Sequence, residues 1–158
     1  MKRLMIVMCL SMLPAAANAA SCGVTASPVA FGAYTSPGGS KIDSMGTISV
    51  TCTPDLILLA CSTSYTIALS AGSGSYSQRR MTSGVNILNY NLYTDSSYGT
   101  VWGDGTSAPV VPGTITTSIL SLVCLPGTRN TTVYGRAPGS QNVGTGAYTD
   151  TIVVTVTF

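Results

Sequence analysis

Short stretches in which apolar and polar residues alternate follow one another along this chain from about residue 20 to its last residue. In the final stretch, from Asp150 to Phe158, every second side chain is apolar and the positions between them are mostly Thr. This is the period-two pattern of a strand with one buried face. The residues that share the buried side are Ile152, Val154, Val156 and Phe158.

Six further stretches have similar patterning and are separated by Gly, Pro and Ser residues typical of turns. The stretch from Val24 to Tyr34 is interrupted by Pro28, so we expect an edge strand or a strand that switches partners there. None of the stretches shows the sustained 3.6-residue period of a helix. The remaining predicted strands are Thr47 to Cys52, Tyr65 to Ser70, Leu88 to Tyr93, Ile115 to Leu125 and Thr131 to Tyr134.

Strands at this spacing predict an all-β fold, an antiparallel β-sandwich, in a single domain. A seven-stranded immunoglobulin-like sandwich would have another strand after the closing one, and here the sequence ends at Phe158. We therefore expect an immunoglobulin-like sandwich that is incomplete and lacks its final strand. An apolar strand at a chain end is either central in its sheet or an edge that pairs with another chain.

Residues 1–19 have the pattern of an export signal. Lys2 and Arg3 form a positive start, an apolar run extends from Leu4 to Leu13, and Ala17-Asn18-Ala19 is a small-residue cleavage site. The apolar run is too short to span a membrane. We expect a mature domain from residue 20 to residue 158, exported to the periplasm and then to the cell surface or exterior.

Four cysteines remain after the signal is removed, and an even number in an exported chain favours two disulfides. Three pairings are possible. We favour Cys22–Cys52 and Cys61–Cys124, since the first would join two early strands of adjacent sequence. A zinc site is disfavoured because the chain has no His and no C-x-x-C pair, so no metal or other cofactor is predicted.

The composition argues against an enzyme and against nucleic-acid binding. The chain has no His, and its five acidic residues are all Asp, so general acid–base chemistry has few candidate groups. Basic and acidic side chains balance after signal removal, which leaves no basic patch for nucleic acid. The pair Arg79-Arg80 is interpreted as a solvated turn. Asp104 in Trp102-Gly103-Asp104-Gly105 has the setting of a turn-capping residue.

One apolar run has two possible interpretations. It lies between Cys52 and Cys61 and could be a buried strand or sheet corner. It could instead be an exposed adhesive loop held by disulfides at both ends, suited to contact with a surface or partner. Its residues are Leu56, Ile57, Leu58 and Leu59, and the stretch from Ala108 to Pro112 has the same two interpretations.

Several short motifs, in order along the whole mature chain, resemble the spore coat protein U domain, which is also the subunit module of archaic chaperone–usher pili. The matching pieces are Cys22 with Phe31-Gly32-Ala33-Tyr34, Ser49-Val50-Thr51-Cys52, Tyr65 to Gly72, Leu88 to Asp95, Trp102-Gly103-Asp104-Gly105, Tyr134-Gly135-Arg136 and Gly146 to Thr151.

The resemblance implies an immunoglobulin-like fold without its last strand. In such pilins a periplasmic chaperone lends a strand, an outer-membrane usher secretes the subunit, and the N-terminal extension of a neighbouring subunit later replaces the chaperone strand. The corresponding groove would lie between the first strand region and the closing strand. Its expected residues are Val24, Val29, Phe31, Ile152, Val154, Val156 and Phe158.

Only Ala20 and Ser21 precede Cys22 in the expected mature chain, whereas a donor segment needs roughly ten to fifteen residues. We therefore expect a subunit that accepts a strand but does not donate one, such as a tip or cap of a pilus. The alternative function is a self-associating coat protein on a spore or cell surface. A third, a secreted sugar- or ligand-binding sandwich that acts as a soluble monomer, has modest support from the aromatic residues Trp102, Tyr90 and Tyr93.

Overall fold

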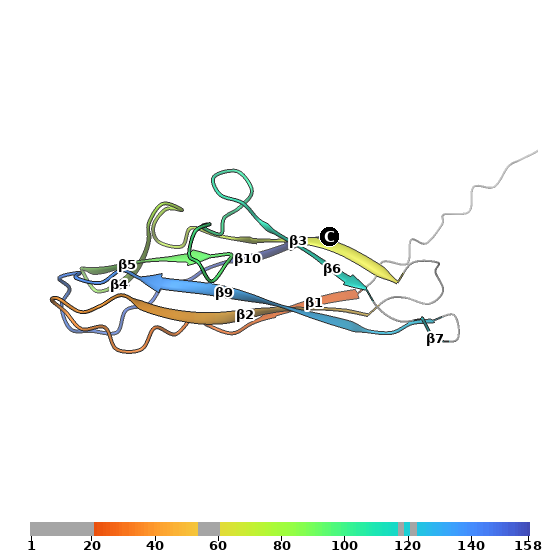
Figure 1. Ribbon diagram of the computed structural model, residues 1–158, viewed down its shortest axis with the longest axis horizontal. Helices are drawn as coiled ribbons and strands as arrows, with labels where there is room; N and C mark the ends of the chain where they lie inside the picture. Colours follow the sequence, from red (N-terminus) through yellow and green to blue (C-terminus); the bar gives the residue numbers. More distant parts are fainter. Residues whose placement is uncertain (1–20, 54–60, 117–118, 121–122) are drawn as a thin grey trace, which may run out of the picture.

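The computed structural model describes residues 21–53, 61–116, 119–120 and 123–158, and the regular elements in these ranges are all β-strands (Figure 1). Within this part of the chain there is no helix long and apolar enough to cross a membrane. The expected export signal and the Leu56 to Leu59 run lie outside the described residues. The predicted all-β sandwich is confirmed.

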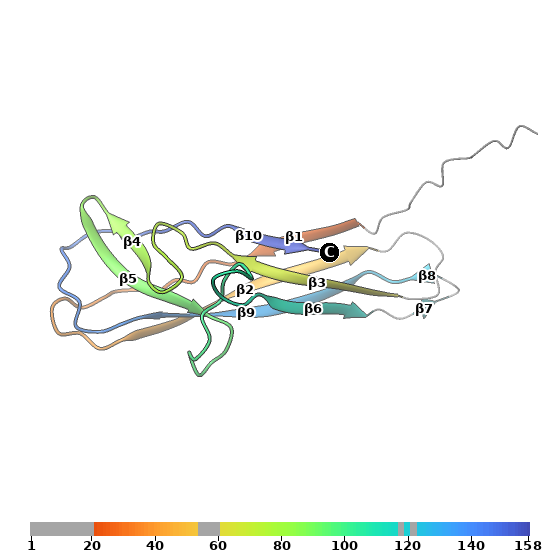
Figure 2. The same ribbon diagram turned by 90° about the horizontal axis from the view of Figure 1, so that it is seen from above.

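Two antiparallel sheets form the layers of the sandwich (Figures 1 and 2). The larger sheet has the strand order β1-β2-β9-β5-β4, and the smaller has the order β10-β3-β6. A two-stranded hairpin, β7-β8, lies at one end of the molecule. The strands are β1 (Ser21–Ala26), β2 (Ile42–Thr53), β3 (Ser62–Leu69), β4 (Arg79–Ser83), β5 (Asn86–Tyr93), β6 (Val111–Thr116), β7 (Ile119–Leu120), β8 (Val123–Cys124), β9 (Gly127–Ala137) and β10 (Val154–Thr157).

Alternate residues of the paired strands form one core between the sheets. In β3 the buried side chains are Tyr65, Ile67 and Leu69, and in β5 they are Leu88, Tyr90 and Leu92, as the alternation predicted. On β2 the corresponding residues are Ile48, Val50 and Cys52. Trp102 is fully buried and its indole N–H donates to the Ile67 carbonyl at 2.9 Å.

Both favoured disulfides are present. Cys22 and Cys52 lie directly opposite each other in the β1–β2 ladder, so this bond joins the first strand to its neighbour. Cys61 and Cys124 connect the start of β3 to β8. The second bond therefore links the smaller sheet to the end of the molecule that carries the β7-β8 hairpin.

The structure corrects two strand predictions. The stretch from Ile115 to Leu125 is not one strand, because β6 ends at Thr116 and the short strands β7 and β8 follow it as a separate hairpin. β4 was not predicted, because Met81 is its only large apolar side chain, so its sequence lacks the alternation of apolar and polar residues that indicates a strand. Its inward position opposite Tyr90 is occupied by a charged residue, Arg79.

The interpretation of Arg79-Arg80 as a solvated turn is wrong for Arg79, which is fully buried, while Arg80 is exposed. The Arg79 guanidinium donates to the Ser70 carbonyl at 3.1 and 2.8 Å, to the Trp102 carbonyl at 2.7 Å and to Asn91 Oδ1 at 2.7 Å. A buried Arg is tolerated when its donors are paired. Arg79 thus joins β4, β5 and the loops that follow β3 and β5.

The predicted turn role of Asp104 is confirmed. Its Oδ1 accepts hydrogen bonds from the Thr106 and Ser107 amides at 2.9 and 3.0 Å, and these bonds lower the pKa of Asp104 to about 2. A lowered carboxyl pKa contributes stability that is fully present above the ordinary value and is lost as pH falls.

We expect an Asp104→Asn variant to lose less stability than the parent between about pH 4 and pH 2, because the Asn side chain has no charge to lose. Thermal unfolding midpoints of both chains across this interval measure the difference. Parallel pH profiles for the two chains would contradict the role of the carboxylate.

Candidate functional site: a groove between two sheet edges

Two edge strands from different sheets lie along the same long side of the sandwich (Figures 1 and 2). β1 is an outer strand of the larger sheet and pairs only with β2 in the described part of the chain. β10 is an outer strand of the smaller sheet and pairs there only with β3. The two edges therefore face a position at which a further strand could be added.

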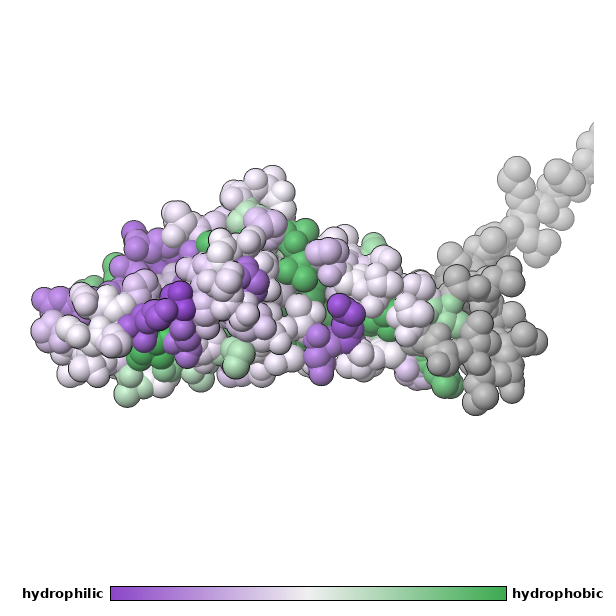
Figure 3. Space-filling model, in the orientation of Figure 1, coloured by the Kyte–Doolittle hydropathy of each residue, from purple (hydrophilic) through white to green (hydrophobic). Residues whose placement is uncertain are grey.

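Inward-facing apolar side chains along these two strands are left partly uncovered. Val24 lies opposite the fully buried Val50, so it points into the sandwich, yet it is 41% exposed. Val156 lies opposite the buried Ile67 and is only partly covered. Phe158 contacts the ring of Tyr65 and is 56% exposed. Figure 3 shows the opposite long side of the sandwich, that of β6 and β9, where a hydrophobic patch lies near the middle among paler and more hydrophilic residues.

A cavity of about 510 Å³ opens between the segment 26–31, which follows β1, and the segment 148–154, which leads into β10. Its floor is the hydrophobic core, contributed by both sheets. The core residues that line it are Ile48, Leu69, Met81, Tyr90, Leu92 and Val133.

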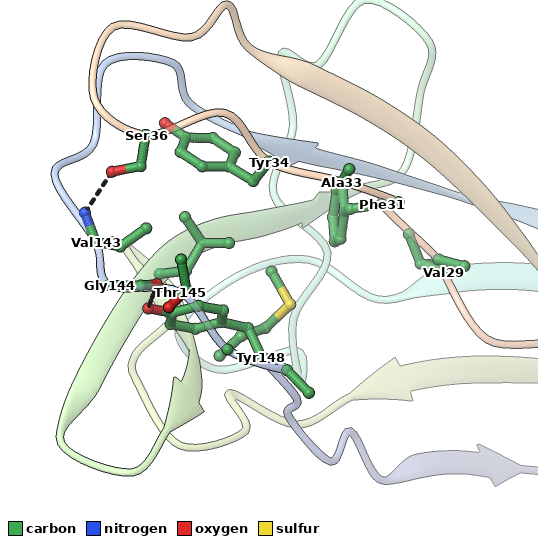
Figure 4. A pocket seen from close by; sticks show the side chains of 15 residues that line it. Val29, Phe31, Ala33, Tyr34, Ser36, Val143, Gly144, Thr145 and Tyr148 are labelled. Carbon is green, nitrogen blue, oxygen red and sulfur yellow. Dashed lines mark hydrogen bonds between the residues drawn. The ribbon is translucent and has the colours of Figure 1, made fainter.

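A second cavity, of about 610 Å³, continues the first one between the segments 29–36 and 143–148 (Figure 4). Val29, Phe31, Met81 and Tyr148 line both cavities, so the two form one continuous groove. We call this the edge groove and define it by its two walls, residues 26–36 and 143–154. In Figure 4 the walls face each other and are joined at one end by the hydrogen bond between Ser36 and Val143.

The first wall is held close to the larger sheet by two glycines. A Cβ at Gly135 would lie 2.5 Å from Val29 Cγ1 and 2.9 Å from the ring of Phe31. A Cβ at Gly46 would lie 2.9 Å from Val29 Cγ2. Ser27 also pairs its amide with the Thr47 carbonyl at 2.8 Å. The absence of side chains at positions 46 and 135 therefore lets Val29 and Phe31 pack against the sheet.

We expect Gly135→Ala to displace Val29 and Phe31 and to destabilise the domain by about 1–3 kcal/mol, the usual range for overpacking. The matched control is Gly23→Ala on β1, because a Cβ there meets nothing within 4 Å. Urea unfolding midpoints compare the two variants with the parent. Equal midpoints for Gly135→Ala and Gly23→Ala would contradict the close packing of this wall.

The second wall is anchored by Asp150. Its carboxylate accepts hydrogen bonds from the Ser73 amide at 3.0 Å, the Ser73 hydroxyl at 2.8 Å, the Thr151 amide at 2.9 Å and the Tyr90 hydroxyl at 2.7 Å. Burial and the neighbouring carboxylate raise the pKa of Tyr90, so its hydroxyl remains a donor. Asp150 is the single charged residue that lines the edge groove in the part of the chain that the structure describes.

The structure brings four of the seven groove residues predicted from sequence into the edge groove, namely Val29, Phe31, Ile152 and Val154. The other three line neither cavity. Val24 lies on β1, Val156 lies on β10, and Phe158 follows β10. Sequence reasoning missed the wall from residue 143 to residue 150, because this Gly- and Thr-rich stretch has no strand period. It also missed Met81, which belongs to the unpredicted β4.

The structure does not support the other candidate sites that it describes. Among the described residues there is no group of three or more His, Cys, Asp or Glu that could hold a metal ion. Trp102 and Tyr90, which gave modest support to sugar binding, are buried and cannot stack on a ligand. The Leu56 to Leu59 run stays a prediction, since it lies outside the described residues.

A model of the Spore Coat Protein U domain family matches residues 8–155. The search of curated proteins finds no match to this chain.

Among solved structures, one similar chain belongs to the crystal structure of the CsuC-CsuE chaperone-tip adhesion subunit pre-assembly complex from archaic chaperone-usher Csu pili of Acinetobacter baumannii. The TM-score is 0.55 at 22% sequence identity, over 89% of this chain and 40% of that chain. At this identity the likeness shows the fold, and the present chain spans less than half the length of its neighbour. The family match extends over nearly the whole sequence, and the chain belongs to the Spore Coat Protein U domain family.

Proposed function

We propose that this protein is a subunit of a chaperone–usher pilus and that its edge groove accepts a β-strand from a partner protein. The observation that carries the proposal is the row of inward-facing, partly exposed apolar side chains between two sheet edges. The family match supports it, as does the fold shared with a chain from a complex of a chaperone and a pilus subunit.

An added strand would act in two ways. Its main-chain groups would pair with a sheet edge, and alternate side chains would enter the groove, which is the β-augmentation mode of peptide recognition. Covering apolar surface is worth about 25 cal/mol per Å². Covering several side chains of the size of Val and Phe therefore amounts to several kcal/mol, a large part of the net stability of a domain.

The proposed partners follow from this strand exchange. A periplasmic chaperone supplies the first strand, an outer-membrane usher exports the subunit, and another pilus subunit supplies the final strand. The proposed location is the periplasm during assembly and the cell surface afterwards, with no catalytic role. A tip or cap position is part of the proposal, because the similar solved chain comes from a complex of a chaperone with a tip adhesion subunit.

Expression in the periplasm, with and without a co-expressed chaperone from a chaperone–usher system, tests this function. We expect soluble protein only with the chaperone, recovered as a one-to-one complex. A stable monomer in the absence of any partner would contradict the proposal. Labelling of assembled filaments with an antibody to this chain then tests the position, since a tip subunit is labelled at filament ends only.

The alternative, a self-associating coat protein, predicts a different result in the same experiment. A second copy of this chain would then cover the groove, so the purified protein alone would form homopolymers. Size-exclusion chromatography of the chain released from its chaperone distinguishes polymers of one component from dependence on a second subunit.

A further inference from the structure

The two ends of the edge groove differ in how its walls are connected. At the end away from β10, the Val143 amide donates to Ser36 Oγ at 2.8 Å, and the Gln141 amide donates to the Tyr34 hydroxyl at 2.8 Å. Tyr34 in turn donates to the Pro138 carbonyl at 2.8 Å. We call these four residues, Tyr34, Ser36, Gln141 and Val143, the clasp. They tie one wall of the groove directly to the other.

The clasp is itself fixed to the larger sheet. The Gln141 side chain accepts a hydrogen bond from the Asn89 amide at 2.8 Å and donates to the Asn89 carbonyl at 2.9 Å. Beyond the clasp, the Ser140 amide donates to the Gly39 carbonyl at 2.8 Å, a further link between the same two segments. This end of the groove is therefore closed by a network anchored on β5.

The opposite end has no such connection. Among the described residues, no hydrogen bond joins the stretch 21–31 to the stretch 148–158. Val24 and Phe158, the inward-facing residues at this end, are both exposed. The groove is thus open between β1 and β10 and closed at the clasp.

We propose that the edge groove is a blind slot, closed at the clasp. The clasp stops the end of the accepted strand that lies nearest to it, which we call the leading end, and so fixes the register of the strand and the number of its residues that fit the groove. This inference rests on the proposed function, because it describes how the accepted strand is positioned. The first wall, residues 26–36, spans at most about 36 Å, at about 3.3 Å per residue. A strand of about eleven residues with alternating apolar side chains fills that length.

Register matters because side chains of a strand alternate between its two faces. A strand that slides by one residue presents its polar side chains to Met81, Leu92 and the other apolar floor residues. A strand that stops against the clasp has a single register, so each of its apolar side chains contacts one defined part of the groove floor. We therefore expect the partner to contribute a short segment in which apolar and polar residues alternate, with no folded or bulky extension at its leading end.

An extension experiment tests the blind end. The probe is an eleven-residue peptide that alternates Val and Thr, with two Thr replaced by Lys for solubility. Two further peptides carry an uncharged Gly-Ser-Gly-Ser extension at the N-terminus or at the C-terminus. Affinity for the mature, disulfide-bonded chain, released from its co-purified chaperone, is measured by fluorescence anisotropy. We expect the extension at the end that faces the clasp to weaken binding by about tenfold or more, because the strand is displaced and an apolar side chain leaves the groove. The extension at the end that faces the open side should change binding by less than about threefold.

Clasp variants provide the internal control. Tyr34→Phe combined with Ser36→Ala removes the hydroxyls that join the walls, and the difference between the two extensions should shrink. Ser40→Ala, at an exposed position beyond the clasp, should retain the full difference. A photoreactive residue at the leading end of the unextended peptide should crosslink to residues 34–36 or 141–145.

The outcomes separate the two proposals. Equal tolerance of both extensions, or crosslinks at the open end only, would overturn the blind slot while leaving strand acceptance intact. Failure of every peptide to bind, together with a soluble monomer in the absence of a chaperone, would overturn the proposed function and this inference with it.

Discussion

Replacing Arg79 by Ala is expected to destabilise the domain by about 3–5 kcal/mol. The guanidinium is fully buried and makes four hydrogen bonds, to Asn91 and to the carbonyls of Ser70 and Trp102. Its removal leaves these acceptors unpaired in the interior and leaves a cavity between β4, β5 and the adjoining loops. Since domains of this size are stable by about 5–15 kcal/mol, the loss is a large fraction of the total.

The neighbouring Arg80 provides a matched control of the same residue type. Arg80 is exposed on the same strand, so Arg80→Ala should change stability by less than about 0.5 kcal/mol. The chain contains one Trp, Trp102, whose buried indole reports unfolding through its fluorescence. Urea unfolding of the three proteins, each purified with the same partner and then released, gives the comparison. Similar midpoints for Arg79→Ala and Arg80→Ala would show that the buried network does not support the fold.

The second large effect is expected on strand binding. Val154 points inward opposite Leu69 and lines the groove, whereas the next residue, Thr155, is exposed on the other face of β10. Val154→Asp places a carboxylate where an incoming apolar side chain would pack. Burying an unpaired charge costs several kcal/mol, so we expect binding of a donated strand to weaken by at least about a hundredfold.

Thr155→Asp is the control, because its carboxylate remains in solvent and introduces the same charge one residue away. The measurement is the yield of chaperone complex from the periplasm, together with the affinity of the Val-Thr peptide. Trp102 fluorescence of the recovered protein checks that each variant is folded. Loss of complex in both variants to the same extent would mean that charge on β10, and not occupation of the groove, determines the result.

The function proposed here depends on which parts of the groove are already formed in the isolated chain. The first wall is packed on Gly46 and Gly135, the second is held by Asp150, and the clasp joins them at one end. At the open end of the groove, the outer edges of β1 and β10 have no partner strand in the described residues. A partner strand would thus complete a largely preformed site, which lowers the entropic cost of binding.

Local patterning in the sequence determined the strands that form the core. β3 and β5 were predicted with the correct buried faces, because Tyr65, Ile67 and Leu69, and likewise Leu88, Tyr90 and Leu92, alternate with mainly polar residues. The even number of mature cysteines indicated two disulfides, and adjacency in sequence favoured the pairing that the structure contains. Such features are readable because their physical cause lies within a few residues of chain.

The tertiary structure alone decided the features that join distant segments. Arg79 can be buried because the carbonyls of Ser70 and Trp102 accept its hydrogen bonds. No pattern in the sequence around Arg79 predicts these partners. The wall from residue 143 to residue 150 has no period, and its position is set by contacts with Tyr90, Ser73 and Ser36. The sequence alone therefore determined the strands and their buried faces, whereas the closed end of the groove arose only where non-local hydrogen bonds brought its two walls together.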